Sequence, residues 1–238
     1  MTNEEFSNGF DTLVRSYTRF RDFDSKESQD TIEFDEYEKS IFLTKAQTEM
    51  VVKLYSGKNP NGDSFESTEE LRRYLESLVK TTSYSKADEV SGIGVSASSV
   101  FFKLPNDLAF ITMEQVIYSD ESLGCYDGNR ASVFPVTQDE YSKVKDNPFR
   151  GPTRYKVIRI DCGNQEVEII SKYKIGTYLL KYLSKPSPII LEDLPNNLTI
   201  EGVSKETECK LNSILHYKLL ERAVEMALLS KGINVRNN

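Results

Sequence analysis

The sequence has little of what enzyme active sites and metal centres are usually built from. Its 238 residues include one His, three Cys and no Trp. The Cys residues, at 125, 162 and 209, are odd in number and far apart, so neither a disulfide framework nor a zinc site is predicted. A single His also leaves Ser-His and Cys-His mechanisms with one weak candidate.

Membrane and secretion signals are missing as well. No apolar run approaches the roughly 18 residues that span a bilayer. Residues 1–10 are acidic and broken by Asn and Gly, so they lack the basic and then apolar order of a secretion signal. We therefore expect no membrane partner. The three widely spaced Cys favour synthesis in a reducing compartment.

Positive charge is scarce, because 30 Lys and Arg face 37 Asp and Glu and give a formal net charge of −7. Release of counterions from nucleic acid needs a clustered excess of cations, so this balance disfavours a protein that reads DNA sequence or coats RNA. Aromatic residues make up 11% of the chain, which is too many for a disordered protein. Many Tyr and Phe beside few aliphatic residues favour a folded domain that completes its burial against partner chains.

The first third of the chain and its C-terminal region have helical spacing of apolar residues, each time after a capping residue. Helices are predicted over about 3–21, 35–57, 67–79, 137–147 and 205–230, beginning in turn at Thr2, Asp35, Ser67, Thr137 and Ser204. The first four of these capping residues are followed three positions later by Glu, which completes a capping box.

From about residue 99 the apolar period changes from helical to alternating. Two β-hairpins are predicted, one turning at 105–107 (Pro-Asn-Asp) and one at 162–164 (Cys-Gly-Asn). Further strands are predicted over 131–136, 177–183 and 188–191. The order of elements predicts an α+β fold, in which a mostly antiparallel sheet built from hairpins stands between an N-terminal helical region and a long C-terminal helix.

Changes in composition along the chain predict six ranges. Residues 81–98 are rich in Ser, Thr and Gly and poor in large apolar groups, which favours a flexible loop or arm. The complete prediction is an N-terminal helical arm (1–21), a linker (22–34), a helical region (35–80), the loop (81–98), a β-rich body with the C-terminal helix (99–232) and a tail (233–238).

Residues that could carry chemistry are few, and each has a simpler interpretation. His216 has no acidic or Cys residue three or four positions away, which favours a structural imidazole over a general base or zinc ligand. The acid pairs Asp120-Glu121 and Glu192-Asp193 could hold Mg²⁺ or support hydrolysis, although a solvated surface is favoured for both. The sequence therefore predicts no catalytic residue, no cofactor-binding residue and no metal ligand.

Phosphate-binding patterns are incomplete. The Gly-Ile-Gly at 92–94 lacks a third Gly, and the Lys within 57–64 stands in the wrong place for a phosphate-binding loop, so no nucleotide site is predicted. Basic residues surround Tyr155 on a presumed strand and could contact phosphates, although the solvent face of a strand commonly has this composition. They are Arg150, Arg154, Lys156 and Arg159.

Three segments carry a family resemblance: 35–55 (DEYEKSIFLTKAQTEMVVKLY), 135–161 (PVTQDEYSKVKDNPFRGPTRYKVIRID) and 178–232 (YLLKYLSKPSPIILEDLPNNLTIEGVSKETECKLNSILHYKLLERAVEMALLSKG). They are similar to the head–tail connector, or neck ring, structural proteins of crAss-like tailed bacteriophages. The resemblance implies a non-enzymatic virion subunit that forms a ring, of twelve copies if it follows the portal, and extends the DNA channel between portal and tail.

The same resemblance implies the partners and the location. The partners are further copies of the chain, the portal protein, other neck or tail proteins, and passing genomic DNA bound without sequence specificity. The expected location is the neck or tail of the virion, after synthesis in the cytoplasm of the bacterial host. No functional residue of the family is carried over to this chain.

Three alternatives remain open at the level of sequence. The first is a tail, baseplate or ejected cargo protein of the same virion. The second is a metal-dependent hydrolase that uses surface carboxylates, and the third is a nucleic-acid binder that uses the basic residues of 150–159.

Overall fold

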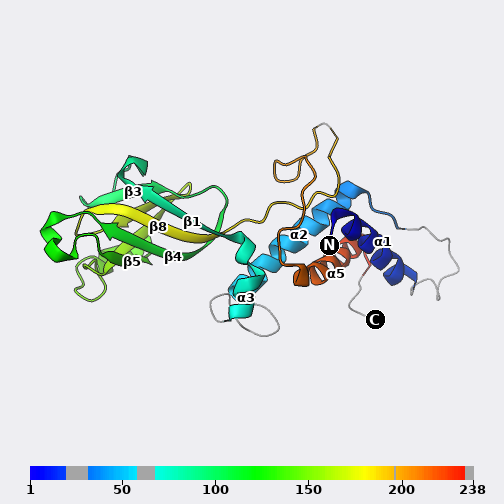
Figure 1. Ribbon diagram of the computed structural model, residues 1–238, viewed down its shortest axis with the longest axis horizontal. Coiled ribbons are helices and arrows are strands. Elements are labelled where there is room, and N and C mark those ends of the chain that lie inside the picture. The colour runs from blue at the N-terminus through cyan, green and yellow to red at the C-terminus, as the bar shows by residue number, and fades with distance from the viewer. Residues whose placement is uncertain (20–31, 58–67, 196, 234–238) are drawn as a thin grey trace. The chain divides into compact units, whose positions relative to one another are not determined.

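The computed structural model of the chain describes residues 1–19, 32–57, 68–195 and 197–233 (Figure 1). The chain divides into two compact units, which we call the helical unit (1–78 and 186–238) and the sheet unit (79–185). The predicted fold class is confirmed, because N-terminal helices, a mostly antiparallel eight-stranded sheet and a C-terminal helix follow one another. The six ranges expected from composition stay a prediction as a division of the chain.

The helical unit is built from three main helices, α1 (Asn3–Arg19), α2 (Glu36–Ser56) and α5 (His216–Ser230). The capping box predicted at Thr2 forms, because the Glu5 amide donates to the Thr2 hydroxyl and the Glu5 carboxylate accepts from the Thr2 amide. The box predicted at Asp35 forms in the same way, and α2 ends at Gly57, whose φ of 73° suits glycine.

Apolar faces hold these helices together, with α5 packed on both α1 and α2. At Gly9 of α1, an added Cβ would lie 2.8 Å from Leu220 Cδ2, so glycine permits the close approach of α1 to α5. The buried apolar residues of the three helices are Phe6, Phe10, Val14, Leu43, Ala46, Val51, Leu54, Leu219, Leu220, Ala223, Val224, Ala227 and Leu228.

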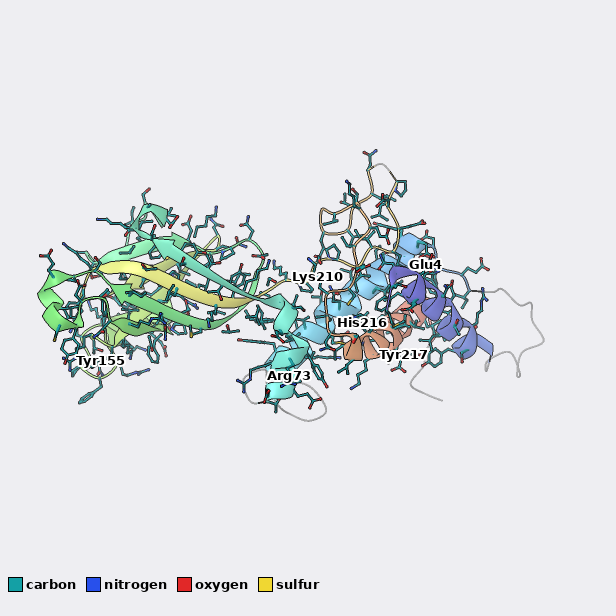
Figure 2. All side chains as sticks on the ribbon, viewed as in Figure 1. Glu4, Arg73, Tyr155, Lys210, His216 and Tyr217 are labelled. Carbon is teal, nitrogen blue, oxygen red and sulfur yellow. The ribbon has the colours of Figure 1, made fainter. Side chains whose placement is uncertain are left out.

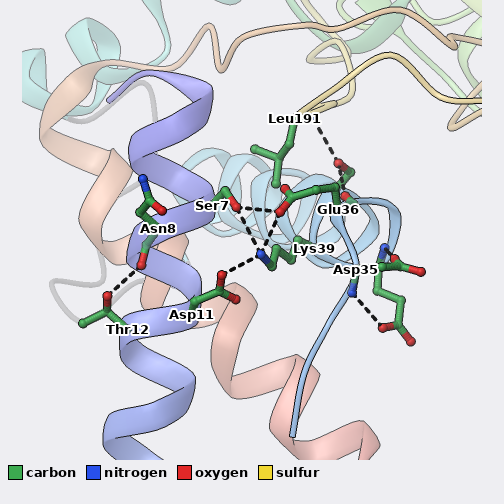
Figure 3. A network of polar contacts seen from close by, with 10 residues as sticks. Ser7, Asn8, Asp11, Thr12, Asp35, Glu36, Lys39 and Leu191 are labelled. Carbon is green, nitrogen blue, oxygen red and sulfur yellow. Dashed lines mark hydrogen bonds and ion pairs between the residues drawn. The ribbon is translucent and has the colours of Figure 1, made fainter.

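A buried cation also joins α1 to α2. Lys39 Nζ lies 2.8 Å from Asp11 Oδ2, 2.8 Å from Glu36 Oε1 and 3.0 Å from Ser7 Oγ (Figure 3). Burial alone would lower the pKa of Lys39, but hydrogen bonds from its ammonium to the two carboxylates raise the pKa above its ordinary value. The charge is therefore retained and paired, as burial of an ammonium requires.

The segment 187–191 lies against α2, and side chains of that helix bond to the backbone of Ile189 and Leu191. Thr44 Oγ1 accepts from the Ile189 amide (3.1 Å) and donates to the Ile189 carbonyl (3.3 Å), while Ser40 Oγ accepts from the Leu191 amide (3.1 Å). The strand predicted over 188–191 is therefore wrong, because this segment makes only an isolated bridge to Thr207. Polar side chains of a helix replace the sheet partner that its peptide groups would otherwise need.

The sheet unit contains eight strands in the order β1-β8-β4-β5-β6-β7-β3-β2, all antiparallel to their neighbours except the parallel pair β5–β6. The strands are β1 (Val79–Ser85), β2 (Glu89–Val90), β3 (Ser99–Lys103), β4 (Leu108–Tyr118), β5 (Arg130–Pro135), β6 (Lys156–Gly163), β7 (Glu166–Ile170) and β8 (Ile175–Ser184).

The parallel pair needs a crossover, and the short helix α4 (Gln138–Val144) lies within it. Tyr141 and Val144 of α4 pack on Ile158 and Ile160 of β6. Because the other face of β6 points into the core of the sheet, this strand is buried on both faces. That burial explains its nearly continuous apolar run.

The sheet curls until strands from opposite ends of its order meet. The ring centroids of Tyr84 in β1 and Phe102 in β3 lie 5.7 Å apart. The ring centroid of Tyr178 in β8 lies 5.6 Å from that of Tyr84 and 5.3 Å from that of Phe102. Its inner face therefore encloses one core, which is formed by Phe102, Leu104, Val116, Tyr118, Ala131, Val133, Val157, Val167, Ile169, Ile175, Tyr178, Leu180 and Tyr182.

The expectation of a loop over 81–98 is wrong for its first part. Residues 79–85 form β1, which pairs along its whole length with β8, and residues 89–90 pair with β3. β1 is an edge strand of the sheet, so its Thr and Ser side chains can face water while its β-branched Thr residues still favour extended backbone. Further on, the buried carboxylate of Glu168 accepts a hydrogen bond from the Val95 amide (2.8 Å).

One predicted hairpin is wrong and the other is confirmed. The Leu108 amide does bond to the Pro105 carbonyl, so a turn forms. The strands on its two sides do not form a hairpin, however, because β3 pairs with β7 and β4 pairs with β8 and β5. The hairpin around 162–164 is confirmed as β6–β7, with a φ of 88° at Gly163. A turn sequence predicts where the chain reverses and leaves open which strands pair afterwards.

The remaining helices are shorter than predicted. The third is α3 (Glu69–Tyr74), followed by the 3₁₀ turn η1 (Glu76–Leu78), and the proposed cap at Ser67 lies outside the described residues. α4 begins after Thr137 as predicted, but Thr137 makes no side-chain capping bond. The last helix begins at the 3₁₀ turn η4 (Ser213–Leu215) and not at Ser204, because Thr207 bonds to Ile190.

We expect Thr44→Val to destabilise the helical unit by about 1–3 kcal/mol, because it leaves a buried amide and a buried carbonyl of Ile189 without this partner. Urea unfolding followed by circular dichroism measures the change. Thr12→Val is the matched control, since its hydroxyl bonds only to the Asn8 carbonyl on an exposed helix face. Equal stability of the two variants would contradict the assignment.

Candidate interaction surface

The basic residues that the sequence places around Tyr155 on a presumed strand lie in different environments. β6 begins at Lys156, so Arg150 and Arg154 precede the strand. Residues 156 and 159 point to opposite faces because side chains alternate along a strand. Arg159 is buried in the core of the sheet, whereas Arg150 and Arg154 are exposed.

Arg159 belongs to a buried polar network. Its Nη1 lies 2.6 Å from Glu114 Oε2 in β4, and the hydroxyl of Tyr178 in β8 donates to the other oxygen of Glu114. Arg159 Nε lies 3.2 Å from Asp161 Oδ1 as an ion pair. Burial opposes the charge of Arg159, but the hydrogen bond and charge of Glu114 hold its pKa above the ordinary value. Its side chain, 10% exposed, is committed to the fold and is not available to a phosphate.

Four exposed residues and the half-buried Lys156 form a second group, which we call the aromatic–cation cluster and define as Tyr126, Phe134, Arg154, Tyr155 and Lys156. The guanidinium carbon of Arg154 lies 4.6 Å from the ring centroids of both Tyr126 and Tyr155. Lys156 Nζ lies 4.9 Å from the ring centroid of Phe134 on β5. Tyr155 is 58% exposed, and its ring points away from the sheet (Figure 2).

Local structure positions the cluster. Tyr126 ends the 3₁₀ segment η3 (Glu121–Tyr126), and Asp120 accepts from the Ser122 amide (3.0 Å) at its start and from the Lys174 amide (2.8 Å). The pKa of Asp120 is lowered mainly by the hydrogen bond from the Ser122 hydroxyl and, to a smaller extent, by the one from the Lys174 amide. Asp120, a candidate metal ligand in the sequence, therefore fixes a turn beside the cluster, and Glu121 is exposed.

The cations of the cluster have no anionic partner within the described part of the chain. Neither Arg154 nor Lys156 forms an ion pair or a side-chain hydrogen bond with another described residue, whereas both lie over aromatic rings. Tyr, Phe and Arg are enriched in the buried centres of protein interfaces. The cluster therefore has the composition and exposure of an interaction surface.

His216 lies at the start of α5 and is 6% exposed. Its Nε2 is 2.9 Å from the Leu211 carbonyl, its Nδ1 is 2.9 Å from the Met1 nitrogen, and its ring packs on Phe6. Because the carbonyl can only accept and the Met1 nitrogen donates, the imidazole is neutral with its proton on Nε2. The ring thus joins α1 to α5.

The other sequence candidates do not assemble into a site. Glu192 and Asp193 are exposed, and Asp193 accepts from the Glu206 amide (2.7 Å). Among the described residues, no group of three or more His, Cys, Asp or Glu could hold a metal ion. At 92–94, a Cβ added to Gly94 would lie 2.4 Å from Ser99 Cβ, so this glycine serves close packing.

No helix within the described ranges is long and apolar enough to cross a membrane.

Comparison with known proteins gives one consistent result. A family model described as phage tail ring protein 3/4 matches residues 1–238. Ring protein 3 of Bacteroides phage crAss001 is 49% identical over 233 residues, which cover 97% of this chain and 96% of that protein. Ring protein 4/5 of the same phage is 30% identical over 236 residues, which cover 95% of this chain and 92% of that protein.

We expect Arg159→Met to destabilise the sheet unit by about 3–5 kcal/mol, because it leaves the buried Glu114 carboxylate without its cation. Lys156→Met removes a cation three residues away on the outer face and should cost under about 1 kcal/mol. Denaturant unfolding followed by tyrosine fluorescence compares the two variants. A small effect at Arg159 would contradict the buried network.

We also expect unfolding stability to fall as the pH drops below about 6.5. Burial lowers the pKa of His216 from its ordinary value, opposed by the bond to the Leu211 carbonyl and reinforced by the charge at the Met1 nitrogen. The unfolded chain then binds the proton more tightly, so stability is complete above 6.5 and is lost toward the lower folded pKa. His216→Gln should remove this part of the slope between pH 7.5 and 5, and identical slopes would contradict it.

Proposed function

The chain belongs to the phage tail ring protein 3/4 family, and we propose that it is a non-enzymatic structural subunit of a ring in the head–tail connector of a virion. The resemblance to structural ring proteins of crAss-like phages, predicted from three segments, is confirmed by this membership. The observation that carries the proposal is the family match over residues 1–238 together with 49% identity to a relative named Ring protein 3.

A ring subunit needs a stiff body and two unlike surfaces, because contacts that repeat head to tail close into a ring only by rotation. The curled sheet, with its enclosed core and buried Arg159–Glu114 pair, supports the first requirement. The aromatic–cation cluster supports the second, since it presents exposed rings together with cations that have no anionic partner among the described residues.

We propose that this ring extends the DNA channel between portal and tail. Its partners are then other copies of the chain, twelve if the ring follows the portal, together with the portal protein and other neck or tail proteins. The net charge of −7 supports passage of DNA, because an acidic wall repels phosphates and lets the genome slide. Sequence-specific contacts with DNA are not required.

We expect the purified protein to form closed rings, alone or with portal protein. Negative-stain electron microscopy and native mass spectrometry give the symmetry and copy number. A tagged copy should lie in the neck of intact particles, where low-resolution imaging can locate it. A subunit that stays monomeric with portal and with other neck proteins, or that is found elsewhere in the particle, would remove the proposal.

A further inference from the structure

We propose that the aromatic–cation cluster of one copy binds the acidic surface of the next copy, and that this contact joins neighbouring subunits of the ring. The inference rests on the proposed function, because it requires that copies assemble. It assigns a binding role to Tyr126, Phe134, Arg154, Tyr155 and Lys156, and it commits to a second copy of the same chain as the occupant.

The cluster is organised before any partner arrives. The guanidinium carbon of Arg154 lies 4.6 Å from the ring centroids of both Tyr126 and Tyr155, so two rings restrict this side chain. The N–H donors of a guanidinium match the two oxygens of a carboxylate. Because the rings already restrict the side chain, less conformational entropy is lost when an anion binds.

The chain itself supplies a matching anionic surface. We call residues 192–195 and 197–208 the acidic loop; it carries five exposed carboxylates and one exposed Lys. No carboxylate of this loop forms an ion pair with a described residue. The five are Glu192, Asp193, Glu201, Glu206 and Glu208.

Charge explains why these two surfaces should meet. Copies that each carry a net charge of −7 repel one another, so a stable contact has to bring opposite charges together. Among the described residues, the cations of the cluster have no anionic partner and the carboxylates of the acidic loop form no ion pair, so these two different surfaces of one chain provide such a contact. A contact between unlike surfaces is the kind that closes into a ring.

Nucleic acid fits the cluster less well than a carboxylate surface does. Phosphate binding draws its strength from many cations, and residues 150–156 offer three, the exposed Arg150 and Arg154 and the half-buried Lys156. One face of each Tyr ring in the cluster is already covered by Arg154, which leaves less ring surface for base stacking.

The test measures assembly of the full chain as a function of concentration, with and without portal protein. Arg154→Glu should raise the concentration needed for half-assembly about tenfold or more, since it places like charges in contact. Lys172→Glu makes the same change in net charge at an exposed residue of the sheet unit and should leave assembly unchanged. Tyr155→Ser keeps the cation but removes one stacking ring, and it should weaken assembly less than Arg154→Glu does.

A charge exchange identifies the partner surface. Combining Arg154→Glu with Glu192→Lys, Glu201→Lys and Glu208→Lys in one chain should restore assembly at low salt. The inference would be overturned if Arg154→Glu assembled normally, or if the charge exchange failed to restore assembly. It would also be overturned if Arg154→Glu lost retention on DNA while its assembly stayed intact. Failure of the unmodified chain to assemble under any of these conditions would instead count against the proposed function, so the two failures are distinguishable.

Discussion

Buried peptide groups must find hydrogen-bond partners, and this requirement organises both units of the chain. In the sheet unit, the peptide groups of neighbouring strands bond to one another. Curling of the sheet then brings Tyr84, Phe102 and Tyr178 together over one enclosed core. In the helical unit the extended segment 187–191 has no neighbouring strand. Ser40 and Thr44 of α2 take that place, which is why a helix that packs on α5 also carries buried hydroxyls.

Local patterns gave correct predictions where the partners are close in sequence. The capping boxes at Thr2 and Asp35 and the β6–β7 hairpin are examples. β1 was not predicted, because it is stabilised by pairing with β8, which lies far along the chain. Val79 of β1, for example, pairs with Leu183 of β8. At the candidate site, the interleaving of cations with Tyr155 was visible in the sequence, but the contribution of Tyr126 depends on tertiary structure. Because side chains alternate between the two faces of a strand, the sequence could have shown that Lys156 and Arg159 point to opposite faces.

The chain treats its charges in two ways. Three buried or half-buried cations are paired: Lys39 with Asp11 and Glu36, Arg159 with Glu114, and Arg222 with Glu49 through two hydrogen bonds of 2.8 and 2.9 Å. Arg154 and Lys156 lie against aromatic rings instead. Pairing inside the fold stabilises each unit, whereas the unpaired cations leave binding capacity at the surface.

The sheet unit is one uninterrupted segment, 79–185, set between two stretches that together make the helical unit. During synthesis on the ribosome, all eight strands therefore emerge before α5 does. The sheet unit can fold while translation continues, whereas α1 and α2 have to wait for the last part of the chain to complete their core. Premature termination near the C-terminus would thus yield a finished sheet beside exposed apolar helices, a species suited to capture by chaperones or removal by proteases.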